Sequence, residues 1–457
     1  MAGKNKEKRY IPKNDLDARE VALCVLLSVT EGKRKCNICL SEALDASSFT
    51  ERDRSFVTVL TEGTLDYLIR IDHIISCYTR KPLGFMNPEA RGILRMAVFQ
   101  IMFLDRVPDS AACNEAVDIA KRRGLSGLSG FINAVLRSVI RDKESGKGKL
   151  FEYPDKSIYY SVPKWLYKRL CRDYGVERAH GIMESWLLKR GVSVRFNLSK
   201  ASEQEIADMI AAEGEGLEKT DMKAIFESHG VKAPEEASLP VVYKLEGRKR
   251  VSELRAFREG YVCVQDPAST LPAAMAGVKE GDHIIDVCAA PGGKSMQLCD
   301  LLKGSGSVEA RDVSEAKIRL IEENIARMGF TNISTKVQDA LVPDEESFFR
   351  ADIVMADLPC SGLGIVGRKP DIKQNIKSYS IEELRELQRE MLLCVSRYVK
   401  PHGTLVYSTC TITPEENEQN AAWAVSHLGF KLVSSIRLLP TAEHDGFFAA
   451  VLKKEFV

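Results

Sequence analysis

Two cysteines and a glycine turn follow apolar runs in the C-terminal part of this chain. The turn 288–294 reads Cys-Ala-Ala-Pro-Gly-Gly-Lys, Cys360 closes Asp-Leu-Pro-Cys, and Cys410 closes Ser-Thr-Cys. A thiolate is a strong nucleophile, and a glycine turn at the start of a helix leaves backbone N–H groups open to a carboxylate or phosphate. Thiols and a glycine turn at successive strand ends indicate one active site.

Acidic residues follow further apolar runs of the same region. Asp312 lies about 20 residues after the turn, the interval at which an acid after the second strand can hold ribose hydroxyls. Asp339 and Asp357 follow two later runs. The turn fits neither G-x-G-x-x-G nor G-x-x-x-x-G-K-[ST]. An adenosine cofactor without a pyrophosphate therefore fits better than a dinucleotide or a nucleoside triphosphate.

Strands that alternate with helices must position these residues. From Asp282 onward, each strand-like run is followed by a helical pattern, which predicts an α/β fold with a mainly parallel, doubly wound, Rossmann-like sheet. Ligands in such sheets bind beyond the carboxyl ends of the strands, where the turn, the acids and the thiols fall. The expected strands are 284–287, 307–310, 333–337, 353–356 and 404–407, with later strands near Lys431 and Phe447.

The N-terminal part has a different pattern. Ala18, Ala22 and Val25 recur at helical spacing, and Asn-Pro-Glu at 87–89 is typical of a helix start. Residues 15–142 therefore predict an all-helical bundle, preceded by a basic tail over 1–14. We expect an all-helical domain over 1–142, a charged linker over 143–150, a small α+β module over 151–260 and the sheet domain over 261–457.

Composition bounds the class of protein. The 65 Lys and Arg residues nearly balance the 64 Asp and Glu residues, so an RNA-binding surface must be a local patch. The 12 cysteines are scattered, no secretory segment is recognisable at the start, and the apolar runs are too short to span a bilayer. We expect a cytoplasmic protein that is not in a membrane. Cys36 and Cys39 form a lone CxxC pair and the histidines lack ligand spacing, so no metal site is predicted.

The motifs around the two thiols resemble those of the RNA 5-methylcytosine methyltransferases, which use S-adenosylmethionine. CAAPGGKS, DLPCSGLG and STCTITPEENE occur in that order, flanked by Asp-Pro-Ala-Ser at 266–269 and Asp-Gly-Phe-Phe at 445–448. The helical part resembles the RNA-binding NusB fold, notably from Asn87 and over 130–137. The combination is similar to the bacterial RsmB type of these enzymes, which acts on a cytosine of 16S ribosomal RNA. The resemblance implies that this RNA is the partner, and we expect a monomer.

The resemblance implies a role for each candidate site residue. Cytosine C5 is a poor nucleophile, so a thiolate must first add to C6. In the family the residue matching Cys410 forms that bond and the one matching Cys360 assists release of the methylated base, although position alone does not rank the two. Asp357 would reach the N3/N4 edge of the base, and Lys294 would lie beside the base and support thiolate formation.

The same resemblance implies a binding site for S-adenosylmethionine. Asp312 would hold the ribose hydroxyls, Asp339 would lie at the adenine side, and the backbone of the turn would hold the methionine end. The residues expected to bind the cofactor are Cys288, Ala289, Ala290, Pro291, Gly292, Gly293, Lys294, Asp312, Asp339 and Asp357.

Several alternatives stay open at the level of sequence. Arg-Lys-Pro-Asp at 368–371 could hold RNA phosphates or be a solvated charge run. The substrate could be another RNA such as tRNA. Methylation of an exocyclic amine or a protein side chain needs no thiol, and its usual Asn/Asp-Pro-Pro-aromatic motif differs from Asp-Leu-Pro-Cys. A non-catalytic RNA-binding factor would be expected to lack the thiols, acids or glycines, which are all present.

Overall fold

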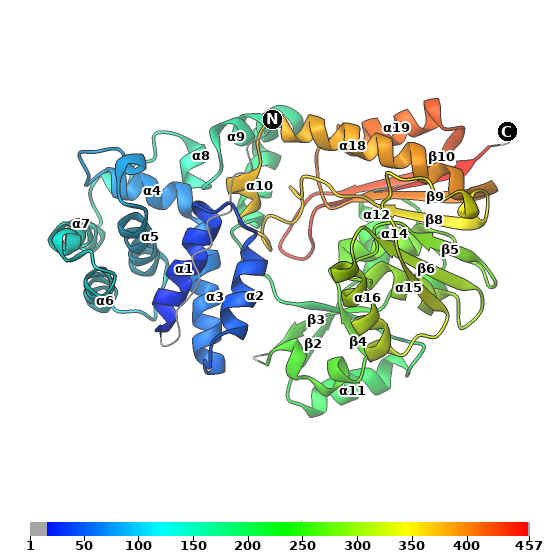
Figure 1. The fold of residues 1–457 in the computed structure, drawn as a ribbon, viewed down its shortest axis with the longest axis horizontal. Coiled ribbons are helices and arrows are strands. Elements are labelled where there is room, and N and C mark those ends of the chain that lie inside the picture. Colours follow the sequence, from blue (N-terminus) through cyan, green and yellow to red (C-terminus); the bar gives the residue numbers. More distant parts are fainter. Residues whose placement is uncertain (1–15, 248, 456–457) are drawn as a thin grey trace. The chain divides into compact units, whose positions relative to one another are not determined.

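The computed structural model describes residues 16–247 and 249–455, so the expected basic tail lies outside the described residues. The chain forms two compact units (Figure 1). The first is Met1–Leu187 together with Val366–Ile376, and the second is Leu188–Ile365 together with Lys377–Val457.

The first unit is helical, as predicted. Asn87 starts one helix by accepting a hydrogen bond from the backbone N–H of Glu89, with Pro88 in the first turn. Gly63 lets two helices approach closely, since a Cβ there would overlap the ring of Phe99. The helices are α1 (Ala18–Thr30), α2 (Cys36–Asp45), α3 (Glu51–Asp66), α4 (Leu68–Ser76), α5 (Pro88–Phe103), α6 (Asp109–Arg122), α7 (Ser126–Ser145), α8 (Lys156–Tyr159), α9 (Lys164–Tyr174) and α10 (Val176–Ser185).

Helix α7 extends farther than its sequence pattern suggested. It continues to Ser145 and ends at Gly146, whose φ of 63° is the left-handed conformation that glycine favours. Lys143, near the end of the helix, forms an ion pair with Asp109 of α6, with 2.9 Å between Nζ and Oδ1. The first part of the charged stretch 143–150, expected as a linker, is thus helical because this contact and the glycine cap set the helix end.

The second unit begins with a small antiparallel sheet of strand order β2-β3-β1-β4. Helix α11 starts at a capping box in which Ser202 and Glu205 satisfy each other's backbone N–H groups. The elements are β1 (Ser193–Phe196), α11 (Glu203–Ala212), β2 (Gly216–Lys219), α12 (Met222–Ser228), β3 (Val242–Glu246), α13 (Arg255–Arg258) and β4 (Val262–Val264).

A seven-stranded sheet of order β10-β11-β9-β8-β5-β6-β7 forms the body of the second unit. The pairs among β5 to β9 are parallel, whereas β11 is antiparallel to β9 and β10 is antiparallel to β11. The predicted mainly parallel α/β sheet is confirmed. The strands are β5 (His283–Asp286), β6 (Ser307–Asp312), β7 (Ile333–Val337), β8 (Ala351–Asp357), β9 (Val399–Thr409), β10 (Phe430–Leu438) and β11 (Phe447–Lys454).

Helices cover both faces of this sheet (Figure 1). Successive residues such as Ile284 and Ile285 point to opposite faces, where they join separate apolar clusters. Helices α14 (Pro267–Met275) and α15 (Gly293–Leu301) pack in one cluster, and α18 (Ser380–Val395) and α19 (Glu418–His427) pack in the other. Because the strand order reverses between β5 and β8, a crevice for a ligand is expected at the carboxyl ends of these strands.

The segment Val366–Ile376 belongs to the first unit although the second unit continues on both sides of it. Lys373, in the short helix α17 (Ile372–Asn375), is fully buried and its Nζ donates to the carbonyl oxygen of Asp66 at 2.8 Å. Asp371 accepts a hydrogen bond from the backbone N–H of Cys36 at the start of α2, at 3.4 Å. The chain thus docks on the helical unit directly after the loop that carries Cys360.

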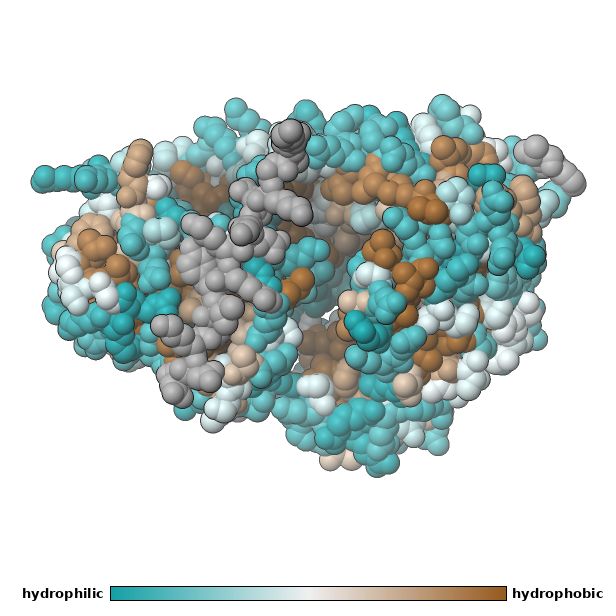
Figure 2. All heavy atoms as spheres, viewed as in Figure 1, coloured by the Kyte–Doolittle hydropathy of each residue, from teal (hydrophilic) through white to brown (hydrophobic). Residues whose placement is uncertain are grey.

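The surface and the cysteines of the described residues give no sign of a membrane span, a disulfide or a metal cluster. Hydrophilic residues cover most of the face drawn in Figure 2. Within residues 16–247 and 249–455, the structure contains no helix of the length and apolarity that a membrane span requires. The cysteines of the described part are free thiols, Cys36 and Cys39 among them, and no cluster of three or more His, Cys, Asp or Glu side chains suited to a metal occurs in that part.

Candidate active site

The two thiols predicted to act together are in contact. Parallel pairing sets Asp357 of β8 opposite Ser408 of β9, so the loops that follow leave the sheet side by side. The Sγ atoms of Cys360 and Cys410 lie 3.3 Å apart, and both side chains are partly buried. One thiol can therefore donate an S–H hydrogen bond to the other.

The surroundings distinguish the two cysteines. The hydrogen bond with Cys410, burial, and the nearby charges of Cys410 and Glu416 raise the pKa of Cys360 well above its ordinary value. Cys360 thus holds its proton more tightly than a free thiol does.

An ion pair lies beside the thiols at the end of β8. Lys294 Nζ is 2.7 Å from Asp357 Oδ2, and the Ser408 hydroxyl donates to Asp357 Oδ1 at 2.8 Å. The ammonium also lies over the ring of Phe447, 5.2 Å from its centroid. Burial alone would disfavour the charged amine, but Asp357, with further contributions from Asp286 and Cys410, raises the pKa of Lys294 above its ordinary value. The site therefore presents a fixed positive charge close to Cys410.

The glycine turn lies between β5 and α15. Gly292 has a φ of 104°, and a Cβ there would lie 2.9 Å from Cε of Met296, so glycine is required. Asp312 braces the turn from β6: its Oδ2 accepts from the backbone N–H of Ala290 at 3.0 Å, and its Oδ1 accepts from Lys317 Nζ at 2.8 Å. The turn is thus held open at the helix start, where unpaired amides favour a carboxylate.

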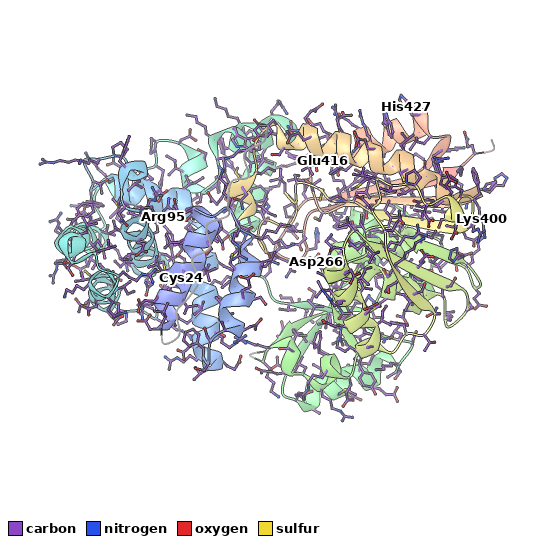
Figure 3. All side chains as sticks on the ribbon, viewed as in Figure 1. Cys24, Arg95, Asp266, Lys400, Glu416 and His427 are labelled. Atoms are coloured by element: carbon purple, nitrogen blue, oxygen red, sulfur yellow. The ribbon has the colours of Figure 1, made fainter. Side chains whose placement is uncertain are left out.

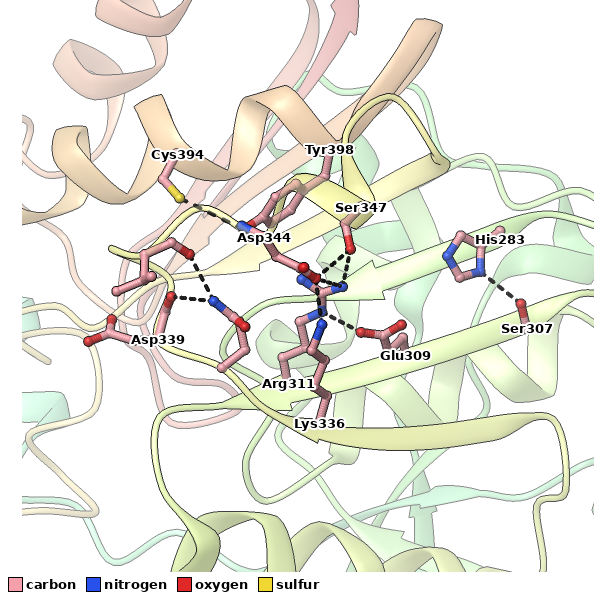
Figure 4. A network of polar contacts seen from close by, with 12 residues as sticks. His283, Ser307, Glu309, Arg311, Lys336, Asp339, Asp344, Ser347, Cys394 and Tyr398 are labelled. Atoms are coloured by element: carbon pink, nitrogen blue, oxygen red, sulfur yellow. Dashed lines mark hydrogen bonds and ion pairs between the residues drawn. The ribbon is translucent and has the colours of Figure 1, made fainter.

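Asp339 follows β7 at the same edge of the sheet. It is half-buried, and its Oδ1 accepts from the backbone N–H of Leu341 at 3.0 Å. A polar network next to it fixes the ends of β6 and β7 (Figure 4). There Arg311, which is buried, pairs with Asp344 at 3.2 Å, and Lys336 pairs with the same carboxylate at 2.6 Å.

Sequence reasoning missed Asp286, the last residue of β5. It is 1% exposed; its Oδ2 accepts from the Ser295 hydroxyl at 2.6 Å, and its Oδ1 has no hydrogen-bond partner among the described residues. Burial raises the pKa of Asp286 to about 7, against the opposing effects of Ser295 and Lys294. The signal in the sequence was an acidic residue within the otherwise apolar run Ile-Ile-Asp-Val.

A third loop closes against the two cysteine loops. The backbone N–H of Gly364 donates to the carbonyl oxygen of Cys410 at 3.0 Å, and that of Gly446 donates to Gly364 at 2.9 Å. A Cβ on Gly364 would overlap the Gly446 carbonyl. The Asp445 backbone N–H reaches Asp266 Oδ1 at 3.0 Å, so the two motifs flanking the domain in sequence meet at this edge.

Sequence reasoning also did not single out Glu416 and Asn417, which follow Cys410 in the same loop. Both are fully buried and form hydrogen bonds with the residues next to the thiols. Figure 3 shows Glu416 and Asp266 at one end of the second unit.

The segment 368–371, in contrast, belongs to the first unit; Lys369 is exposed and Asp371 is buried.

Comparison with known proteins assigns the family. Residues 273–453 match the model of the 16S rRNA methyltransferase RsmB/F family, and residues 16–141 match the NusB family. The probable ribosomal RNA small subunit methyltransferase B of Bacillus subtilis is 34% identical over 407 residues, which cover 88% of this chain and 86% of the relative. The chain belongs to the RsmB/F family. A probable methyltransferase B of Synechocystis is 30% identical over 460 residues, covering 96% of this chain and 100% of the relative.

Solved structures agree with the RsmB/F assignment. A methyltransferase homologue from Pyrococcus horikoshii has 26% sequence identity and a TM-score of 0.56, covering 66% of this chain and 100% of that protein. A further crystal structure covers 97% of this chain at 25% identity with a TM-score of 0.76. The resemblances inferred from the motifs, to this family and to NusB, are confirmed.

Proposed function

We propose that this chain transfers a methyl group from S-adenosylmethionine to C5 of a cytosine in 16S ribosomal RNA. The observation that most directly supports this proposal is the contact of the Cys360 and Cys410 thiols at 3.3 Å beside the Lys294–Asp357 ion pair. Methyl transfer to an amine needs no thiol, whereas C5 methylation needs one that adds to C6. The full-length relatives named small subunit methyltransferase B support the ribosomal substrate.

Cys410 is the nucleophile of the proposed reaction. Its thiolate forms a bond to C6, and the electrons of the C5–C6 double bond make C5 nucleophilic. C5 could then accept the methyl group that S-adenosylmethionine would supply, with the C–S bond electrons remaining on the sulfur of the cofactor. Loss of the C5 proton to a base then restores the double bond and breaks the C6–S bond, which returns Cys410 as a thiolate. The raised pKa of Cys360 supports this order of roles, because a thiol that keeps its proton is a poor nucleophile.

Lys294 and Asp357 support the charged steps. The Lys294 ammonium lies close enough to Cys410 for that thiol to contribute to the raised pKa of the amine, so a positive charge faces the proposed nucleophile. Asp357 is held by Lys294 and Ser408, so it can face the N3/N4 edge of the base without rearranging. Cys360 assists release of the methylated base in this proposal.

The residues around the glycine turn fit S-adenosylmethionine, which supplies an electrophilic methyl group. The α15 start offers backbone amides to the methionine carboxylate, and the unpartnered, buried Asp286 Oδ1 offers an acceptor to its ammonium. Asp312 and Asp339 are proposed to hold the ribose and adenine sides. The residues proposed to line this site are Cys288, Ala289, Ala290, Pro291, Gly292, Gly293, Lys294, Asp312, Asp339 and Asp357.

The direct test is methylation of an unmodified 16S rRNA transcript with labelled S-adenosylmethionine, followed by nucleoside mass spectrometry. The expected product is 5-methylcytidine, absent with the Cys410→Ala variant. Transcripts of tRNA in parallel test the alternative substrate. Product formation by Cys410→Ala, or a methyl group on an exocyclic amine, would refute the proposed chemistry.

A further inference from the structure

Asn417 holds the strand end that carries Cys410. Its Oδ1 accepts from the Thr409 hydroxyl at 2.6 Å, and its Nδ2 donates to the carbonyl oxygen of Thr411 at 3.1 Å. These partners are the residues immediately before and after Cys410. Asn417 therefore fixes the backbone on both sides of the proposed nucleophile.

Glu416, the adjacent residue, holds the other cysteine loop. Its Oε1 accepts from the backbone N–H of Ser361 at 2.8 Å, and its Oε2 accepts from the Ser361 hydroxyl at 2.6 Å. Ser361 immediately follows Cys360. The Ser361 hydroxyl is also 2.6 Å from the hydroxyl of Thr411, so the two loops are linked to each other through the Glu416 carboxylate.

Helix α18 completes the support from behind. Gln388 donates from Nε2 to Glu416 Oε1 at 3.1 Å and to the carbonyl oxygen of Pro359, which precedes Cys360, at 3.0 Å. Asn420 donates to Gln388 Oε1 at 2.8 Å and thereby orients its amide. The loop of Cys360 is thus held on both sides, as is the loop of Cys410.

The burial of this network indicates that it fixes the positions of the two cysteine loops. Glu416, Asn417, Gln388 and Asn420 are 0% exposed, and an unpaired carboxylate at such depth would be strongly unfavourable. Apolar side chains of similar volume could fill the same space without that cost. A fully hydrogen-bonded polar cluster instead specifies one arrangement of the segments it joins.

We propose that Glu416 and Asn417 are the positioning residues that hold the Cys360 and Cys410 thiols in contact. The catalytic consequence rests on the proposed function, because only a covalent mechanism needs both thiols at one base. The contact itself can be measured without methyl transfer.

The Glu416 charge has a second effect on the thiol pair. It adds to Cys410 and burial in raising the pKa of Cys360, while burial raises the pKa of Glu416 itself against its hydrogen bonds. The charged groups on the other side of the pair are Lys294 and Asp357. A negative charge behind Cys360 thus disfavours the thiolate form of Cys360.

The first experiment measures the sulfur contact by oxidation. Diamide takes two electrons and two protons from a thiol pair and leaves a disulfide, which peptide mass spectrometry can assign to Cys360 and Cys410. In the full chain, Asn417→Ala should slow formation of this disulfide by about tenfold or more, since misplacement near 1 Å has effects of that size. Glu383→Gln, on the exposed face of α18, is the control and should oxidise at the wild-type rate.

The second experiment uses Glu416→Gln, which keeps the side-chain shape and removes the charge. The Ser361 and Thr413 hydroxyls can rotate to accept from the new amide, so folding is preserved better than with alanine. The pH dependence of Cys360 alkylation by iodoacetamide should shift to lower pH in this variant and not in Glu383→Gln. Thermal unfolding and S-adenosylmethionine binding confirm that the variants are folded.

The outcomes separate the two proposals. Slower disulfide formation and a shifted alkylation profile support the positioning roles even if wild-type protein yields no 5-methylcytidine, which would refute only the proposed function. Wild-type oxidation rates in folded Asn417→Ala together with an unshifted profile in Glu416→Gln would overturn the positioning proposal, whatever the methylation result.

Discussion

The Sγ atoms of Cys360 and Cys410 lie 3.3 Å apart although 50 residues separate them in the chain. The contact arises because β8 and β9 are parallel neighbours with Asp357 opposite Ser408, so their carboxyl ends leave the sheet together. The fold therefore brings two thiols that are distant in sequence within hydrogen-bond range of each other.

Loss of Cys360 should trap the reaction rather than prevent it. Cys360→Ala keeps the proposed nucleophile and lacks the residue that assists release, so the Cys410 adduct with RNA should accumulate. Denaturing gel electrophoresis of protein with labelled rRNA should show a slow, nuclease-sensitive band. The same band with Cys360→Ala/Cys410→Ala would contradict the assignment of Cys410.

Loss of Lys294 should slow methyl transfer by about 100-fold or more, the usual range for a group that assists proton or charge movement. Lys294→Met keeps the length of the side chain and removes the ammonium that pairs with Asp357 at 2.7 Å. Single-turnover methylation at saturating rRNA gives the rate. Lys279→Met, at an exposed site of the same unit, is the control; equal rates in both variants would refute a role for Lys294.

The stability of the protein should depend on pH through Asp286. The pKa of this carboxyl is about 7 when folded and about 3.8 ordinarily, so between these values the folded protein keeps a proton that the unfolded chain has lost. This group's contribution to the free energy of unfolding therefore falls as pH rises from about 4 to about 7 and is constant above.

Asp286→Asn should remove that dependence. The free energy of unfolding of Asp286→Asn relative to wild type should rise with pH across this window, by at most about 1.4 kcal/mol per pH unit. Urea unfolding at a series of pH values measures it. Parallel stability curves for the two proteins would show that Asp286 titrates normally.

A methyl group on Gly364 should disturb the thiol pair without touching it. Gly364→Ala would push its Cβ into the Gly446 carbonyl and toward the carbonyl oxygen of Cys410, which cannot move independently of the strand. We expect a loss of stability of roughly 1–3 kcal/mol and a larger relative loss of methylation. Gly181→Ala, with open space around it in α10, is the matched control for urea unfolding and activity.

The sheet and its chemistry could be predicted because they follow apolar runs. Each expected strand was found, although β9 begins at Val399, earlier than 404, because polar Lys400 and His402 interrupt the apolar pattern at an irregularity in the pairing with β8. The thiols, Lys294 and Asp357 lie at strand ends or in the segments that follow them. Their placement is therefore a property of local sequence and parallel topology.

The supporting residues could not be predicted in the same way. A glutamate shortly after a proline, such as Glu416 after Pro414, is typical of an exposed turn. Glu416 is buried because Ser361 and Gln388, from distant segments of the chain, form hydrogen bonds with it. Asp286 could not be distinguished from other residues of its strand, since its hydrogen bond with Ser295 depends on how α15 packs. Burial of this kind depends on contacts between segments far apart in the sequence. No local pattern of apolar residues reveals it.

The docking of Val366–Ile376 on the helical unit limits how this protein can be divided. The polypeptide crosses between its units at 187–188, 365–366 and 376–377, so a cut after 187 leaves Val366–Ile376 attached to the second unit. A fragment that starts at Leu188 would retain Lys373 but lose Asp66, whose carbonyl oxygen accepts a hydrogen bond from the Lys373 ammonium. Lys373 lies in the segment that follows the loop of Cys360. Such a fragment would carry a segment of the first unit without the helices on which that segment packs.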